Sequence, residues 1–383
     1  MTYQPTSLQS FDAVQFRHQL HKHPELSECE FNTAETLVNQ LKAFGLKPEK
    51  GIGGNGIVCV IDSGKEGETT LLRADFDALP IQEKAHHDHV SETDGVMHAC
   101  GHDGHTSSMM LVAKHFAEHG IKLGKLILLF QPAEETGTGA AAMLRNPLLK
   151  ELSIDSVFAY HNLPGEPLGR IVLKSGTFAC ASTGVAIEFQ GKTSHAARPE
   201  NGLSPANVMM ETSAYLQSMP AHYPEAFSLV TLVHARLGEE AFGVAPGYAK
   251  VMATLRSDCN ITFSKMKSDL QQMLAKLEMD SGISVTLKWD EPFNAAVNSA
   301  EHVAIVAEQA EKLGMDVKTL AEPIRWSEDF SEFLMKWPGA LFCIGSGESH
   351  PQLHNPDYDF PDEVLEKASS LFIAIAESLH GSN

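Results

Sequence analysis

The sequence predicts an α/β protein in which a large domain with a mostly parallel sheet is interrupted by a smaller α+β domain. Strand and helix patterns alternate through the first 180 residues, and the order changes to β-α-β-β-α-β between about 180 and 292. The 383 residues also exceed what one hydrophobic core usually supports. We therefore expect one domain from residues 1–180 and 293–383, and a second from residues 181–292.

The large domain opens with two helices and several β-rich segments. Apolar residues recur at helical spacing on both sides of "HPEL", which predicts two helices ending near Gly45. The segments "NGIVCVI" and "TTLLRADFDAL" are β-rich, "DGHTSSMMLVAKHFAEHG" predicts a helix closing at Gly120, and "KLILLFQPAEE" predicts a buried strand running into a loop. Parallel sheets of this kind collect their ligand sites at the carboxyl ends of the strands.

The inserted segment follows a different order. It contains a strand "TGVAIEFQG", a helix "SPANVMMETSAYLQSM", two strands "AFSLVTLVHARLG" and "YAKVMATLRSD", a helix "SKMKSDLQQMLAKLEM" and a strand "ISVTLKWDEP". This order is that of a ferredoxin-like sandwich, which can form a self-contained insert. A helix "AEHVAIVAEQAEKLG", a buried strand "GALFCIGSG" and a closing helix "DEVLEKASSLFIAIAESL" then return to the large domain.

Charge and hydropathy exclude several classes of protein. The formal charge of −20, from 49 acidic and 29 basic residues, argues against binding to nucleic acid or to an anionic membrane surface. No apolar run approaches the roughly 20 residues of a membrane span, and "MTYQPTSLQS" lacks the pattern of a secretion signal. We expect a soluble, cytoplasmic enzyme. The six cysteines are scattered singly, which is not the spacing of a disulfide framework.

The stretch "MHACGHDGHT" at residues 97–106 is rich in metal-type ligands. Cys100 and His102 are one residue apart, so both can point toward a common centre in a loop, and thiolate and imidazole suit a borderline divalent metal. A buried cysteine beside surface histidines is the alternative.

Two adjacent glutamates form a second group. Glu134 and Glu135 follow an apolar strand in "QPAEE", where paired carboxylates are costly unless cations neutralise them. One can ligate a metal while its neighbour accepts a proton from water; a solvated loop tip is the alternative. His161 in "VFAYHNLP" and His354 in "PQLHNPDYDF" follow further β-rich runs, and each alone would be read as a core or surface residue.

Together, these segments resemble the M20 family of metallopeptidases, in particular its amidohydrolase branch of hippurate hydrolases, N-acyl-amino-acid amidohydrolases and auxin-conjugate hydrolases. The matching segments run in order along the chain: "LHKHPELS", "LLRADFDALP", "MHACGHDGHT", "FQPAEE", "YHNLPG", "GKTSHAARPE", "SEDF" and "LHNPDYDF". The resemblance implies a zinc-peptidase-like catalytic domain with an inserted lid and dimerisation domain.

The resemblance also implies a site with two divalent ions, for which zinc, manganese, nickel and cobalt are all suitable. The implied ligands are Cys100, His102, Glu135, His161 and His354. Glu134 falls on the family's general base, and Cys100 stands where the wider family has a bridging aspartate. Asp75 and Asp77 lie where that wider family has a ligand histidine and its orienting aspartate, so we expect them to contact the ligands rather than the metal; helix or turn caps are the alternative.

The imported roles agree with the chemistry of amide hydrolysis. Two divalent ions activate a water and polarise the carbonyl, so no protein nucleophile is needed, and the sequence contains no "GxSxG" elbow.

The resemblance assigns further roles to the inserted domain. His195 in "GKTSHAARPE" matches a histidine that donates a hydrogen bond to the oxyanion, with a turn histidine as the alternative. Arg198 and Arg256 can pair with a substrate carboxylate, although a surface salt bridge would also explain each. Relatives usually carry an "NVIPD"-like segment where this chain has "GVAPG", so a substrate contact is missing or supplied elsewhere. We expect a homodimer formed through the inserted domain.

The sequence therefore predicts a metal-dependent amidohydrolase that converts small N-acyl-amino acids to a carboxylic acid and a free amino acid. A dipeptidase or carboxypeptidase is the nearest alternative, because the same attack by water opens a peptide bond. A metal-dependent binding protein without turnover is the alternative of another class.

Overall fold

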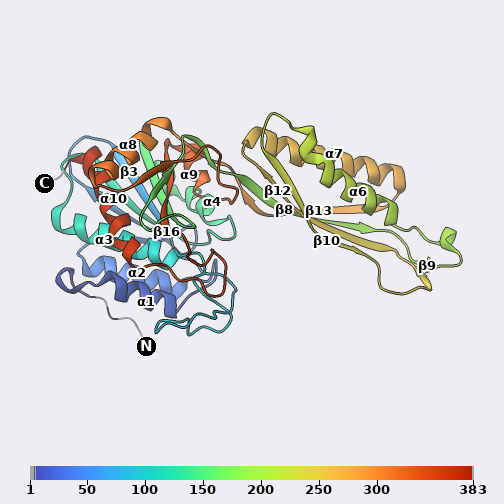
Figure 1. Cartoon of the computed structure of the whole chain (residues 1–383), viewed down its shortest axis with the longest axis horizontal. Coiled ribbons are helices and arrows are strands. Elements are labelled where there is room, and N and C mark those ends of the chain that lie inside the picture. The colour runs from blue at the N-terminus through green and yellow to red at the C-terminus, as the bar shows by residue number, and fades with distance from the viewer. Residues whose placement is uncertain (1–3, 5, 382–383) are drawn as a thin grey trace. The chain divides into compact units, whose positions relative to one another are not determined.

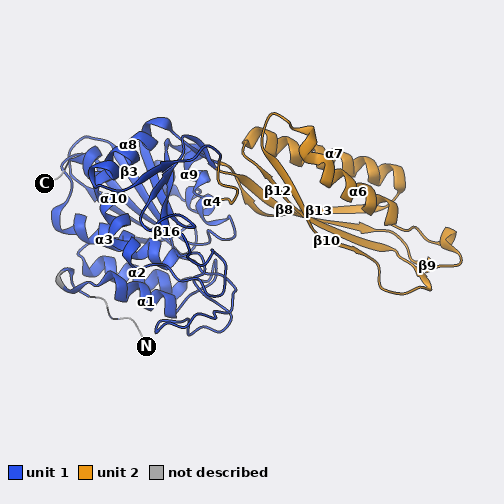
Figure 2. Cartoon of the chain, in the orientation of Figure 1, with its two compact units in different colours: residues 1–178, 296–322, 329–383 blue, residues 179–295, 323–328 orange. Residues whose placement is uncertain are grey.

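The computed structural model describes residue 4 and residues 6–381, which form two compact units (Figure 2). Unit 1 comprises Met1–Phe178, Ala296–Glu322 and Asp329–Asn383, and unit 2 comprises Ala179–Ala295 and Pro323–Glu328. The sequence placed the inserted domain at 181–292 and left the segment Pro323–Glu328 in the larger domain. Residues 1–3, 5, 382 and 383, which the sequence assigned to the ends of the larger domain, lie outside the described residues.

Unit 1 is a mixed α/β structure built on a sheet of eight strands (Figure 1). Its strands are β1 (Glu49–Ile52), β2 (Gly56–Asp62), β3 (Thr69–Asp75), β4 (Lys125–Gln131), β5 (Ser156–Pro164), β6 (Ile171–Leu173), β15 (Val317–Thr319) and β16 (Gly339–Gly347), in the order β1-β2-β4-β3-β5-β16-β6-β15. Its helices are α1 (Ala13–Lys22), α2 (Phe31–Ala43), α3 (His102–His119), α4 (Gly139–Leu144), α5 (Pro147–Glu151), α8 (Ala300–Lys312), α9 (Ser331–Lys336) and α10 (Glu363–His380), with a short 3-10 helix at Leu8–Ser10. A separate pair of short strands, β7 (Gly176–Ala179) and β14 (Ala296–Asn298), completes the list.

The sheet forms because its central segments are apolar on both faces. All seven residues of β3 are buried, as are six of the seven residues of β4. Alternate residues of β4, namely Leu126, Leu128 and Phe130, point into one core together with apolar side chains of α1, α2, α3, α8 and α10. The helices therefore bury one face of the sheet and hold its central strands in place.

The four central strands, in the order β4-β3-β5-β16, are parallel neighbours. Their carboxyl ends consequently meet at one edge of the sheet, which is where the sequence placed the candidate ligands. His161 differs from the other candidate ligands because it does not follow the end of its strand. It lies inside β5, paired with Cys343, because the ladder with β16 continues to Pro164.

Unit 2 has the β-α-β-β-α-β order that the sequence predicted. Its main strands are β8 (Ala181–Gln190), β10 (Ser228–Leu237), β12 (Tyr248–Ser257) and β13 (Ser284–Phe293), and its helices are α6 (Ala206–Ser218) and α7 (Asn260–Ser281). The strands form an antiparallel sheet in the order β10-β12-β8-β13, and both helices pack on it. A small ribbon of β9 (Ser194–His195) and β11 (Val244–Ala245) and two 3-10 helices (Pro199–Asn201 and Met219–His222) complete this unit.

Within residue 4 and residues 6–381, no helix combines the length and the apolar character that crossing a bilayer requires.

Candidate active site

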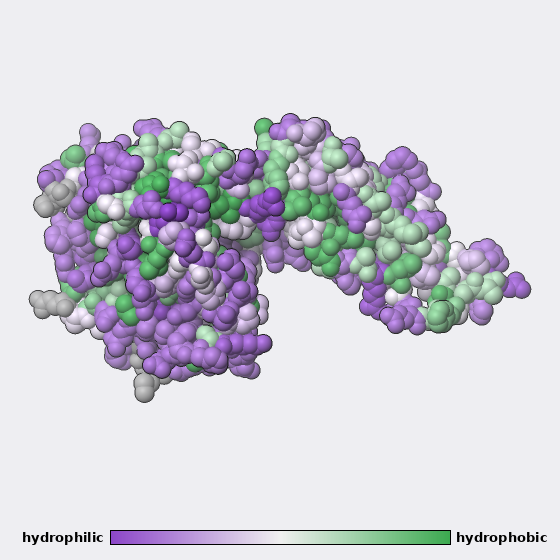
Figure 3. All heavy atoms as spheres, viewed as in Figure 1, coloured by the Kyte–Doolittle hydropathy of each residue, from purple (hydrophilic) through white to green (hydrophobic). Residues whose placement is uncertain are grey.

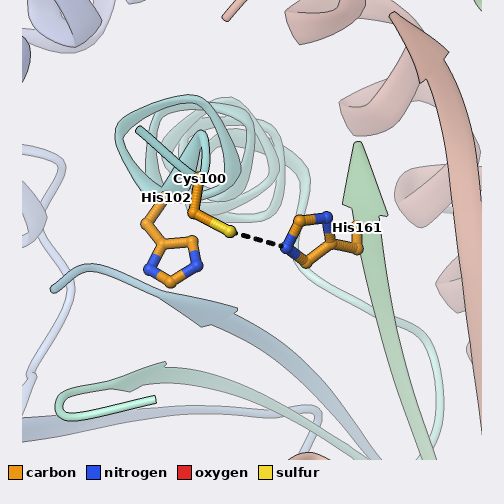
Figure 4. Close-up of side chains that lie close together, drawn as sticks. All are labelled: Cys100, His102 and His161. Atoms are coloured by element: carbon orange, nitrogen blue, oxygen red, sulfur yellow. Dashed lines mark hydrogen bonds between the residues drawn. The ribbon is translucent and has the colours of Figure 1, made fainter. Parts of the chain in front are cut away.

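Cys100 and His102 are positioned by the start of α3. Gly101 between them has φ 91°, and a Cβ at this residue would lie 2.6 Å from the side-chain oxygen of Asn162 and 2.9 Å from the hydroxyl of Tyr358. Glycine is therefore needed for the chain to turn into the helix at this point. The turn directs Cys100 toward β5, and Figure 4 shows Cys100 pointing at His161, with 3.4 Å between Sγ and Nε2.

His102 is oriented by a carboxylate. Its Nδ1 lies 3.1 Å from Oδ1 and 3.0 Å from the carbonyl oxygen of Asp77. The second carboxylate oxygen of Asp77 accepts hydrogen bonds from Ser27 (2.7 Å) and from the backbone N–H of Glu135 (3.0 Å). With Nδ1 occupied, Nε2 of His102 faces Glu135 at 3.8 Å, and this buried nitrogen has no hydrogen-bond partner. Asp77 thus leaves one imidazole nitrogen available to a metal.

The two glutamates follow β4 on a tight turn. Ala133 has φ 51°, and its N–H donates to Glu30 at 2.8 Å, which holds the turn. Glu134 is buried and accepts a hydrogen bond from the backbone N–H of Asp329 at 3.3 Å. Burial raises the pKa of Glu135 to about 8, although His102 lowers it, and the Oε1 atom of Glu135 is buried without a hydrogen-bond partner.

His354 and His161 complete the group. The backbone N–H of His354 donates to Ala99 at 2.8 Å, which holds this loop beside Cys100, and the Nε2 atom of His354 lies 3.5 Å from Glu135. His161 donates from Nδ1 to the carbonyl oxygen of Asn162 at 2.7 Å. Burial holds the pKa of His161 well below its usual value, so the ring is neutral and Nε2 can act as a ligand.

The structure brings the five predicted ligands and Glu134 into one cluster. Ligand atoms lie within 4.8 Å of one another in three overlapping triads, which are Cys100, His102 and His161; Cys100, Glu135 and His354; and His102, Glu134 and Glu135. Burial, followed by the charges of Glu135 and Glu134, raises the pKa of Cys100 well above its usual value. The cluster therefore combines soft and hard donors with unpartnered buried atoms. This combination fits divalent metal ions.

Asp75 belongs to a deeper layer of the site. Its carboxylate pairs with Arg73 at 2.5 Å and accepts from Nδ1 of His105 at 2.6 Å, while its Oδ2 lies 3.6 Å from Nε2 of His102. Burial raises the pKa of Asp75, but Arg73, His102 and His105 outweigh this effect and hold it well below the usual value. Asp75 is therefore an anion in contact with His102, a predicted ligand.

Sequence reasoning assigned no role to Arg73, His105 or Asp329. Arg73 is fully buried and contacts Asp329 at 3.2 Å, and Asp329 also accepts from Gln131 at 2.6 Å. Because Asp329 donates its backbone N–H to Glu134, this network holds the glutamate in position. The signal in the sequence was a charge inside the apolar strand "TTLLRAD", since a buried arginine needs anionic partners.

The other predicted site residues lie in unit 2. His195, on β9, and Arg198 are both exposed. Nδ1 of His195 accepts a hydrogen bond from the backbone N–H of Ala197 at 3.1 Å. Arg256 is half-buried on β12 and donates to the carbonyl oxygen of Arg325 at 2.9 Å and to Ser327 at 3.3 Å.

Comparison with known proteins identifies relatives over nearly the whole chain. The chain is 32% identical over 364 residues to a hippurate hydrolase from Campylobacter jejuni, covering 94% of both chains. It is 30% identical over 372 residues to an N-acetyl-L-cysteine deacetylase from Bacillus subtilis, covering 97% of this chain and 88% of the relative. A solved structure of a dinuclear metal-binding M20 peptidase from Bacillus subtilis superposes with a TM-score of 0.81 at 26% identity, covering 97% of this chain and 98% of the other. Residues 71–378 match the model of peptidase family M20/M25/M40, and the chain belongs to this family.

Proposed function

We propose that this protein is a metal-dependent amidohydrolase that splits N-acyl-amino acids into a carboxylic acid and a free amino acid. The observation that carries the proposal is the cluster at the carboxyl edge of the sheet, which is buried apart from the exposed His354. Within it, His102 Nε2 and Glu135 Oε1 have no hydrogen-bond partner and Glu134 lies alongside. Two relatives are named for the hydrolysis or deacetylation of N-acyl-amino acids, and the solved neighbour binds two metals.

In this proposal, two divalent ions are held by the five donors of the cluster. These are Cys100, His102, Glu135, His161 and His354, and zinc, manganese, nickel and cobalt are the ions that this donor set suits. When bound, such ions lower the pKa of water and polarise an amide carbonyl. Asp77 keeps His102 in the tautomer whose Nε2 can bind, and Asp75 places a negative charge beside the same ring.

Glu134 is the general base in this mechanism. It accepts a proton from the attacking water as the new carbon–oxygen bond forms, and it then delivers that proton to the amide nitrogen as the carbon–nitrogen bond breaks. The hydrogen bond from the backbone N–H of Asp329 holds the carboxylate of Glu134 in position for this role.

His195 is the proposed donor to the oxyanion. The hydrogen bond that Nδ1 accepts from Ala197 means that the ring proton of the neutral form is on Nε2. The exposed Nε2–H can therefore donate to the oxygen that becomes negative when water attacks. Arg198 and Arg256 are the proposed partners of the substrate carboxylate, since a guanidinium matches a carboxylate in geometry and charge.

We also propose a homodimer through the inserted domain. Strand β10 is an edge strand, and apolar side chains of unit 2 are exposed on it and beyond it: Val233 is 55% exposed, Phe242 108% and Val244 51%. Figure 3 shows hydrophobic side chains at the surface over β10. An unpaired edge with apolar residues favours association with another chain. The cytoplasmic location expected from the sequence stays a prediction.

The test is a comparison of substrates. The purified protein is incubated with benzoyl- and acetyl-amino acids and with matched dipeptides, and the free amino acid is quantified. The proposal requires faster turnover of the acyl-amino acids. Preference for dipeptides would support the peptidase alternative, and binding without turnover of either class would support a binding protein.

A further inference from the structure

A second group of metal-type side chains includes none of the five proposed ligands and is centred on the end of α1. It consists of His21 on α1, Glu83 and His87 in the loop before α3, and Asp359 in the loop before α10, and we call it the α1 cluster. Nitrogen or oxygen atoms of His21, His87 and Asp359 lie within 4.8 Å of one another. Nothing in the mechanism proposed above uses these side chains.

His21 is oriented in the same way as His102. Its Nδ1 lies 2.9 Å from the carboxylate of Asp103, which is fully buried. Its Nε2 therefore points in the opposite direction, where it lies 3.2 Å from Oε1 of Glu83. A carboxylate on one imidazole nitrogen with the other directed at a ligand group is the arrangement found around metal-binding histidines.

His87 approaches the same carboxylate without forming a hydrogen bond. Its Nε2 lies 3.1 Å from Oε1 of Glu83 and 3.9 Å from Oδ2 of Asp359, yet neither ring nitrogen has a hydrogen-bond partner. Metal–ligand distances of about 2.0–2.2 Å place the ligand atoms of a tetrahedral zinc site about 3.3–3.6 Å apart. Oε1 of Glu83 lies just inside this range of separations, 3.2 Å from His21 Nε2 and 3.1 Å from His87 Nε2, and Oδ2 of Asp359 lies just beyond it, 3.9 Å from His87 Nε2.

The charge around the α1 cluster favours a cation. Asp103, Asp359 and Asp362 all contact the guanidinium of Arg17, and Glu83 adds a fourth carboxylate beside His21 and His87. Burial lowers the pKa of His21, but Asp103 and Glu83 outweigh this effect and hold it at about 9. A proton on His21 therefore occupies the position that a metal would take, and an ion that binds at Nε2 releases this proton to solvent.

The ring of His87 is held in place at the border of a surface hollow. It stacks on His89 with 3.8 Å between ring centroids, and His89 stacks in turn on His18 at 3.7 Å. His18, His87 and His89 line a surface hollow together with Lys22, so an ion can reach the cluster from solvent.

We propose that His21, Glu83, His87 and Asp359 form a separate binding site for a divalent transition-metal ion, with zinc as the best match to two imidazoles and two carboxylates. The ion would join α1, the loop before α3 and the loop before α10. Since Asp103 is the second residue of α3 and follows the proposed ligand His102, the site stabilises the scaffold next to the active site. The inference does not depend on the proposed function.

The test counts bound zinc. The full chain is stripped with a chelator and dialysed against buffered zinc, and metal and protein are quantified for wild type, His87→Ala and His86→Ala. His86 is the matched control because it is the adjacent, exposed histidine. We expect His87→Ala to bind one ion fewer than wild type and His86→Ala to bind the same number. Equal binding by His87→Ala and wild type, or an equal loss in His86→Ala, overturns the proposal.

A second measurement locates the missing ion. Cobalt bound to a cysteine thiolate has a sulfur-to-metal charge-transfer band, which reports on Cys100 and not on the α1 cluster. Glu83→Gln is isosteric and keeps an acceptor for the N–H of Ser91, which Glu83 binds at 2.6 Å. Loss of one cobalt ion with an unchanged band in Glu83→Gln and His87→Ala supports the α1 site. Loss of the band in both variants would place the missing ion at Cys100 and overturn the proposal. If wild type shows no such band, the result counts against metal binding at Cys100 and does not affect the α1 site, which the count of bound zinc tests separately.

Discussion

Replacing Asp77 by asparagine should weaken metal binding without removing a ligand. Asparagine has the shape of aspartate, but one of its two side-chain positions becomes an NH2 donor. In one orientation this donor faces the N–H of Glu135, which then loses its acceptor. In the other it faces Nδ1 of His102, so that only the carbonyl oxygen of Asp77 still accepts from this nitrogen. The tautomer with an unprotonated Nε2, the atom proposed to bind metal, is then less favoured.

The costs of the substitution in metal affinity and in folding stability can both be estimated. Changing a carboxylate that orients a metal-binding histidine typically costs 10–100-fold in metal affinity, or about 1.4–2.7 kcal/mol. The unsatisfied N–H of Glu135 would add a loss of stability of about 1 kcal/mol.

The assay is competition with a chromophoric chelator for zinc. Asp94→Asn serves as the control, because it makes the same charge change at an exposed loop residue. We expect Asp77→Asn to release zinc at a chelator concentration at least tenfold lower than wild type or the control. Equal affinities of Asp77→Asn and Asp94→Asn would refute the role of Asp77.

Four further predictions follow from the same site. Glu134→Gln should keep its metal content and lose about 10²–10⁴-fold in turnover, because general acid–base catalysis supplies that factor. Glu135→Gln should instead lose metal. Near-normal turnover of Glu134→Gln would exclude Glu134 as the base. Cys100 should resist alkylation in the metal-loaded protein and react after chelation. Because burial raises the pKa of its thiol, the two forms should be compared at alkaline pH. Equal labelling of both forms would count against ligation. Metal affinity should rise with pH through 8 and beyond, because binding must displace protons from Glu135, whose pKa is about 8 without metal, from His102, whose pKa is about 10, and from the Cys100 thiol, whose pKa burial raises. Calorimetry in buffers of different ionisation enthalpy measures that release, and affinity that is constant from pH 6 to 8 would contradict it. His195→Ala should bind metal normally and lose about 10²–10³-fold in turnover, the usual cost of removing one donor to the oxyanion. Recovered activity in heterodimers of His195→Ala with Glu134→Gln would show that His195 acts across a dimer, whereas inactive heterodimers would reject that arrangement.

The long elements could be predicted from the sequence because their periodicity is strong. The two helices before Gly45, the helix that ends at Gly120 and the six main elements of unit 2 all appear in the structure. Short elements such as β6, β15, α4 and α9 were not predicted, since three to six residues are too few to show a period. Their positions depend on pairing with distant segments, as when β15 pairs with β6.

Polar contacts between residues far apart in the sequence could not be predicted either. Arg73 and Asp329 are 256 residues apart, and Arg17 and Asp359 are 342 residues apart, so no local pattern joins them. The candidate ligands could be predicted from the sequence because each lies in a short segment that resembles the family. His105 shows the limit of that approach. It lies in the same ligand-rich stretch, but its two nitrogens lie 2.6 Å from oxygens of Asp75 and Asn162.

The central claim is that metal bound at this site is required to hydrolyse N-acyl-amino acids. The most direct measurement is release of free amino acid from an N-acyl-amino acid by the chelator-stripped protein, before and after reloading with zinc, manganese, nickel or cobalt. We expect stripping to abolish release and at least one ion to restore it in proportion to the metal bound at Cys100. Undiminished release by the stripped protein would contradict the account.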